Sequence, residues 1–221
     1  MSNHKIYKWA IEHRHPIFLL GLLLFFILPE IFEKVFFITI PSQLIMSILV
    51  LSSMLLIKTS ARFRIVPYLL VLGLIIFMVI WNNYRAFPKI AEAAYIILFI
   101  YFSSITYYLF RDLMNSKKIT VSVIIGAFAG YFLIGVIYFF VFAFLDLAYP
   151  DTCSVDMTAS GGIDDMFYFS FITLTTIGYG DFSPTSGLGQ KLAILEGLVG
   201  QFYIAIIMAI LVGKFLTRSS E

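Results

Sequence analysis

Hydrophobic residues gather into long runs along the chain, and short polar segments separate these runs. A helix needs about 20 apolar residues to cross a bilayer. We therefore expect six membrane spans, over Pro16–Phe32, Val35–Ile57, Ile65–Trp81, Ile90–Phe110, Ile119–Leu147 and Leu188–Leu216. The first run is short, so a cleaved signal peptide is the alternative there. No small-residue cleavage site follows it, which favours a retained span.

The segment between the last two runs breaks this pattern. Residues 163–175 form an apolar stretch that is too short for a span and is typical of a re-entrant helix. Residues 175–184, TTIGYGDFSP, follow it and are polar and rich in glycine. Irregular backbone at membrane depth is tolerated only where protein buries it or where it lines water. The pattern thus predicts an all-α membrane protein whose polar loop lies inside an assembly.

Composition agrees with a membrane protein, since 61% of the residues are hydrophobic and 13% are charged. The net charge of +2 is too small to indicate a nucleic-acid partner. The sequence shows no nucleophile–base pair, metal cluster or phosphate-binding loop, so we expect no enzyme, no catalytic residue and no cofactor. Cys153 is the single cysteine, which excludes an intrachain disulfide. It could bridge two subunits, but we expect an unpaired thiol.

Positive charges are distributed unequally between the two ends of the spans, and cytoplasmic loops carry the excess. With six crossings, one side receives Lys5, Lys8, Arg14, Lys58, Arg62, Arg64, Arg111, Lys117, Lys118, Lys214 and Arg218. The other side receives Lys34, Arg85, Lys89 and Lys191. This bias predicts cytoplasmic termini and an extracellular polar loop in the plasma membrane. The three histidines precede the first span, where we expect a solvated interface rather than a metal site.

The chemistry of the loop follows from its backbone. The residues Thr176, Ile177, Gly178, Tyr179 and Gly180 can turn successive carbonyl oxygens, with the Thr176 hydroxyl, toward a dehydrated cation. The glycines permit the dihedral angles that this arrangement needs. We expect the Ile177 and Tyr179 side chains to point away from the ion and to pack behind the strand.

The stretch TIGYGD resembles the selectivity filter of tetrameric potassium channels, whose TVGYG loops coordinate K⁺ through carbonyl oxygens. Ile177 replaces the usual valine, which adds one methylene to an outward side chain. The resemblance implies a homotetramer with K⁺ bound at Thr176, Ile177, Gly178 and Tyr179. K⁺ would be the bound and transported ion, and no soluble ligand is evident.

The resemblance also implies residues that support the filter. Tyr168 and Phe169 match the paired aromatics that surround the filter in this family, although plain hydrophobic packing is the alternative. The Tyr168 hydroxyl could reach Asp181 at the filter exit. Glu196 is the one acidic residue well inside a span, and an intramembrane carboxylate indicates function. We favour a buried strut bonded to Ser170, Thr173 or Thr175 over a titrating gate element.

The last span resembles an inner helix that lines the pore and carries the gate. Gly200 follows Asp181 by nineteen residues, where the family often has a hinge glycine. Close helix packing is the other interpretation, and we favour packing together with some hinging. Ile204, Met208 and Val212 share a helix face and are the expected cavity wall and lower gate.

The chain thus divides into a short N-terminus over 1–15, a four-helix domain over 16–110 and a pore domain over 119–216. The pore domain contains the pore helix 163–175, the filter 176–181 and the inner helix 188–216. The layout resembles that of voltage-gated channels, but the fourth span has no Arg or Lys between Lys89 and Arg111. Because steep voltage gating needs several charges per subunit, we expect weak or absent voltage gating. The alternatives are a non-conducting scaffold or sensor and a subunit of a potassium-uptake system.

Overall fold

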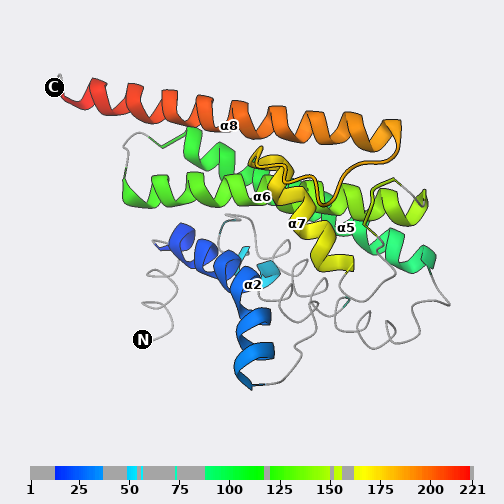
Figure 1. The fold of residues 1–221 in the computed structure, drawn as a ribbon. Coiled ribbons are helices and arrows are strands. Elements are labelled where there is room, and N and C mark those ends of the chain that lie inside the picture. The colour runs from blue at the N-terminus through cyan, green and yellow to red at the C-terminus, as the bar shows by residue number, and fades with distance from the viewer. Residues whose placement is uncertain are drawn as a thin grey trace. The chain divides into compact units, whose positions relative to one another are not determined.

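The computed structural model describes residues 13–36, 49–53, 56, 73, 88–116, 120–149, 152–155 and 162–219. The labelled helices in these ranges are α2 (Arg14–Phe36), α5 (Pro88–Met114), α6 (Val121–Ala148), α7 (Gly162–Leu174) and α8 (Gly187–Ser219). Every labelled element in the described part of the chain is a helix (Figure 1), as the sequence predicts. All of the predicted third span except Gly73, most of the second and most of segment 1–15 lie outside the described residues.

Three helices in the described ranges are long and apolar enough to cross a membrane: Glu92–Met114, Val121–Ala148 and Gly187–Ile207. They correspond to the predicted fourth, fifth and sixth spans. The apolar part of α2, Arg14–Leu28, is shorter. The count of six spans therefore stays a prediction.

The chain divides into two compact units. The N-terminal unit comprises residues 1–86, 108–116 and 120–129. The other unit comprises 87–107, 117–119 and 130–221, and we call it the pore unit because it contains most of the predicted pore domain. Helices α5 and α6 each contribute residues to both units.

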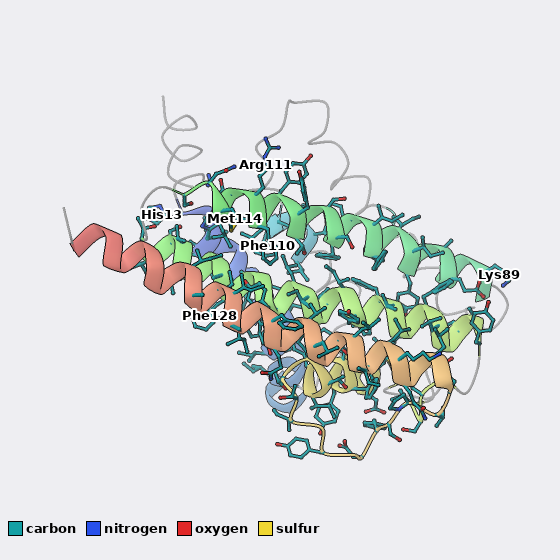
Figure 2. The ribbon with its side chains drawn as sticks, turned by 90° about the horizontal axis from the view of Figure 1, so that it is seen from above. His13, Lys89, Phe110, Arg111, Met114 and Phe128 are labelled. Atoms are coloured by element: carbon teal, nitrogen blue, oxygen red, sulfur yellow. The ribbon has the colours of Figure 1, made fainter. Side chains whose placement is uncertain are left out.

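Helix α5 carries charge at its two ends. Figure 2 shows Lys89 at one end of this helix and Arg111 and Met114 at the other. No Lys or Arg lies between Lys89 and Arg111 in the sequence. The helix therefore has the form of an apolar span with basic ends and lacks a ladder of positive charges.

In the N-terminal unit, Phe18 and Leu22 of α2 are fully buried, as are Leu49 and Val50. A polar cluster lies at the start of α2. His15 is only 4% exposed, and its Nδ1 lies 3.0 Å from the Ser122 carbonyl oxygen. The expectation of a solvated interface is therefore wrong for His15, because three chain segments converge on it and exclude water.

Aromatic rings fill the core of the pore unit. Phe140 of α6 stacks on Phe102 of α5 with ring centroids 5.6 Å apart. On its other side, α6 meets the short helix α7 through Phe142 and Phe169, 5.0 Å apart. Apolar residues on every face suit a helix that is surrounded by others, and α6 is such a helix.

Local signals fix where α7 and α8 begin. Asp164 and Asp165 occupy the first turn of α7, where carboxylates favour the positive end of the helix dipole. The Ser186 hydroxyl caps α8 by accepting a hydrogen bond from the Gly189 amide at 3.0 Å. Helices α7 and α8 pack against each other. These two boundaries isolate residues 175–186 as the loop that carries the candidate site (Figure 1).

Candidate functional site

The backbone of the loop alternates in handedness. The φ angle is positive at Thr176 (57°), Gly178 (53°) and Gly180 (82°), and these are every second residue. Alternation of left-handed and right-handed residues turns successive peptide carbonyls toward the same side of a strand. Glycine adopts positive φ readily, whereas a β-branched threonine there is strained. The loop is thus a ribbon that can present a row of carbonyl oxygens.

The amides at the inner end of the ribbon are bound to α7. The Ile177 and Gly178 amides both donate to the Ile172 carbonyl, at 2.9 and 3.1 Å. The Thr176 amide donates to the Thr173 carbonyl at 3.0 Å. These hydrogen bonds hold one edge of the ribbon against α7. Ile177 and Tyr179 are 54% and 72% exposed in the single chain.

The other end of the ribbon is bound to the middle of α7. The Tyr168 hydroxyl donates to Asp181 at 2.8 Å, which confirms the predicted contact. The Tyr168 ring also meets the ring of Phe182 edge-on, with centroids 6.0 Å apart. Phe169 is 3% exposed and packs into the core. The two adjacent aromatics therefore differ: Phe169 anchors α7, and Tyr168 contacts the ribbon.

A second segment, residues 152–155, contacts the loop beyond the ribbon. Cys153 forms an isolated antiparallel bridge with Pro184, and the Ser154 amide donates to the Ser183 carbonyl at 2.8 Å. Cys153 is 4% exposed. Burial, and next the negative charge of Asp146, raise the pKa of its thiol from 9.0 to about 12. The thiol is therefore neutral and shielded in the single chain.

Glu196 of α8 lies behind α7, as the sequence predicts. Its side chain is fully buried, and the Ser170 hydroxyl lies 2.6 Å from Oε1. Of the three hydroxyls proposed as partners, the structure selects Ser170. The hydroxyls of Thr173 and Thr175 instead bind carbonyls of their own helix, those of Phe169 and Phe171.

Gly200 lies where α8 passes closest to the end of α7. A Cβ atom built there would lie 2.3 Å from the Leu174 carbonyl oxygen. This distance supports the packing interpretation of Gly200. Ile204 is 47% exposed in the single chain, whereas the side chains of Met208 and Val212 lie outside what the structure describes. The gate and cavity predictions for these three residues stay predictions.

Two contacts of the loop were not predicted from the sequence. The Gln201 amide nitrogen of α8 donates to the Thr176 hydroxyl oxygen at 3.1 Å. The Tyr131 hydroxyl of α6 donates to the Leu174 carbonyl at 3.2 Å. An amide side chain within an apolar span was the available signal for Gln201. Tyr131 has no such signal, because tyrosines are common in these spans.

Comparison with known proteins adds a family to this geometry. The model of a family described as "Ion channel" matches residues 94–217, which is more than half of the chain. This chain belongs to that ion channel family. The match covers α7, the ribbon and nearly all of α8, so a non-enzymatic channel protein of the membrane is the coarse assignment.

Two curated relatives match the chain over short stretches. The inward rectifier potassium channel Kirbac3.1 of Paramagnetospirillum magnetotacticum is 34% identical over 74 residues, 34% of this chain. Protein LctB of Bacillus caldotenax is 39% identical over 59 residues, 27% of this chain. The matched parts span 24% and 42% of those two proteins. No solved structure matches the chain.

Proposed function

We propose that this chain forms a potassium-selective channel that conducts K⁺ passively through a pore shared by four copies. The observation that carries the proposal is the ribbon 176–180, whose φ angles are positive at every second residue. Carbonyl oxygens that replace the hydration shell are the basis of K⁺ coordination in filters of this kind. Thr176, Ile177, Gly178 and Tyr179 would supply these oxygens.

A single chain offers the ion only one side of such a shell. The homotetramer is supported by the apolar surface that α8 leaves uncovered, where Ile194 and Phe202 are 63% and 62% exposed. A membrane protein does not place ribbon backbone against lipid, so the ribbon needs neighbours or water. Four copies around an axis would meet both needs and would leave a water-filled path.

Weak or absent voltage dependence is the second part of the proposal. One charge moved through 100 mV is worth about 2.3 kcal/mol, and steep gating uses several charges per subunit. Helix α5 has none between Lys89 and Arg111. We place the channel in the plasma membrane with cytoplasmic termini, following the distribution of basic residues.

Potassium selectivity is tested with purified protein in vesicles. We expect K⁺ flux to exceed Na⁺ flux strongly and barium to block it. Gly178→Ala should abolish selective flux and leave the tetramer intact on native gels, because the change strains the ribbon at φ 53° and touches no other described atom. Equal flux of K⁺ and Na⁺ would rule out the selective filter.

Voltage dependence is tested in planar bilayers with symmetric K⁺. We expect a shallow conductance–voltage relation, and a steep one would contradict this part of the proposal. Absence of any flux from a folded tetramer would favour the alternative, a non-conducting or heteromeric subunit of a transport system or sensor.

A further inference from the structure

Glu196, Ser170 and Gly135 form a hydrogen-bonded chain across three helices of the pore unit. The Ser170 hydroxyl oxygen of α7 lies 2.6 Å from Glu196 Oε1 of α8 and 2.9 Å from the Gly135 carbonyl oxygen of α6. Ser170 and Glu196 are both 0% exposed. Solvent therefore does not reach the side chains of Ser170 and Glu196.

A count of protons decides the charge of Glu196. A serine hydroxyl has one proton to donate, and a backbone carbonyl only accepts. An ionised carboxylate also only accepts. With an ionised Glu196, the single Ser170 proton would face two acceptors, and one of the two short contacts would be a repulsion between oxygens. With a protonated Glu196, the carboxyl group donates to Ser170 and Ser170 donates to Gly135, so both contacts are hydrogen bonds.

The second carboxyl oxygen gives an independent indication. Glu196 Oε2 is buried and has no hydrogen-bond partner among the described residues. A buried carboxylate oxygen without a donor is costly, because it keeps a large share of the negative charge. As the carbonyl oxygen of a neutral acid, it carries less charge and its isolation costs less.

Among the described residues, no basic side chain forms an ion pair that would hold a carboxylate at Glu196. Glu196 takes part in no ion pair within the described ranges. The titratable groups that interact with it electrostatically include Tyr131 and Tyr138 of α6 and the Cys153 thiol. Each of these groups is neutral at neutral pH, and none can offset a negative charge.

We propose that Glu196 is a neutral, protonated carboxylic acid at neutral pH and is the donor that starts a directed chain from α8 through Ser170 to the α6 backbone. Its role is positioning, because the chain fixes α7, and with it the ribbon, against two helices. The assignment of a proton to Glu196 does not depend on the proposed channel function. The consequence of that proton for the filter does rest on the proposed function.

Infrared difference spectroscopy tests the proton directly. The spectrum of the purified protein minus that of Glu196→Gln should contain the carbonyl band of a protonated carboxylic acid at neutral pH. The band should persist across the pH range in which the protein stays folded, and it should shift in Ser170→Ala, which loses the acceptor. Carboxylate bands in the difference spectrum would overturn the proposal.

Thermal unfolding tests the positioning role. Glutamine keeps an N–H donor, so Glu196→Gln should retain the melting temperature of the tetramer, whereas Glu196→Leu should lower it. Ser170→Ala should lower it similarly, and the double variant Glu196→Leu, Ser170→Ala should lose little more. Ser104→Ala is the matched control, because within the described ranges that hydroxyl donates to the Ile100 carbonyl of its own helix. Equal losses in Glu196→Gln and Glu196→Leu would overturn the positioning role, and neither readout depends on ion flux.

Discussion

Glu196 in the pore unit and His15 in the N-terminal unit are both buried titratable side chains, but their surroundings differ. In the pore unit, Glu196 contacts a hydroxyl group and has no ionic partner in the described ranges. In the N-terminal unit, His15 lies between charges: its Nε2 is 3.4 Å from Arg14 Nε and 3.1 Å from Asp112 Oδ2. The hydrogen-bonded chain from Glu196 through Ser170 to Gly135 is neutral and depends on exact donor geometry. The cluster of Arg14, His15 and Asp112 depends on opposite charges at helix ends.

Because of this difference, we expect substitutions in the two units to have different effects. Geometry in the pore unit places the backbone of the ribbon, so small steric changes there should have large effects on assembly and selectivity. The cluster at His15 joins the start of α2 to residues Asp112 and Ser122. Its loss should weaken the fold and leave selectivity unchanged.

The largest expected effect comes from Gly200→Ala in the pore unit. The added Cβ would lie 2.3 Å from the Leu174 carbonyl oxygen. Because that oxygen belongs to the backbone, no side-chain rotation can relieve the clash. We expect a loss of at least about 3 kcal/mol in stability, at the upper end of overpacking costs, measured by thermal unfolding of the purified protein.

Gly197→Ala is the matched control for this prediction. Its Cβ would lie 3.7 Å from the Thr173 carbonyl oxygen, an ordinary contact. Alanine favours the helix over glycine by about 0.5–1 kcal/mol, so this variant should be as stable as the native chain or more so. If Gly200→Ala also kept full stability, the close approach of α8 to α7 would be wrong.

The next effect is expected from Asp112→Asn in the N-terminal unit. The change removes the charge that faces both Arg14 and His15. Because Asp112 is 21% exposed, solvent screens part of the interaction, and we expect a loss of about 1–2 kcal/mol that shrinks at high salt. The ratio of K⁺ to Na⁺ flux should stay the same, and a changed ratio would contradict the separation of roles.

Glu92→Gln serves as the control for Asp112→Asn. The Lys89 side chain that pairs with Glu92 at 3.0 Å is 84% exposed. Pairs of this kind contribute about 0.2–1 kcal/mol at most. A loss equal to that of Asp112→Asn would show that net charge, rather than the cluster at His15, determines the effect.

A smaller effect is expected from Gln201→Leu. The variant keeps the volume of the side chain and removes the donor to the Thr176 hydroxyl. A net hydrogen bond of about 0.5–1.5 kcal/mol corresponds to a change of roughly two- to tenfold. We expect a change of that size in barium block from the cytoplasmic side, with stability preserved. Unchanged block would show that Gln201 does not position Thr176.

The comparison also separates what the sequence predicts from what it does not. The bounds of α7 and α8 follow from local signals, since an apolar run, a polar break and a cap at Ser186 are all readable. The Tyr168–Asp181 contact follows from the family pattern. Glu196 contacts Ser170 rather than Thr173 or Thr175 because of the rotation of α8 relative to α7. No local sequence pattern determines that rotation.

The interpretation of His15 shows the same limit more strongly. A histidine beside basic residues at the start of a span has the pattern of a solvated interface. Burial came from Asp112 and Ser122, which are 97 and 107 positions away in the sequence. Contacts between residues so far apart leave no periodic pattern along the chain, so a single sequence does not reveal them.

The smallest expected effect on the fold concerns Cys153, which lies beside the outer end of the ribbon. Its pKa of about 12 lowers the thiolate fraction at neutral pH by about three orders of magnitude relative to a free cysteine. Maleimide labelling of the folded protein should therefore be slow, and labelling after denaturation should be fast. Because the unfolded thiol ionises near 9.0 and the folded one near 12, stability should fall as pH rises between these values. Fast labelling of the folded protein, or disulfide-linked dimers on a non-reducing gel, would contradict the shielded thiol and would favour a bridge between subunits.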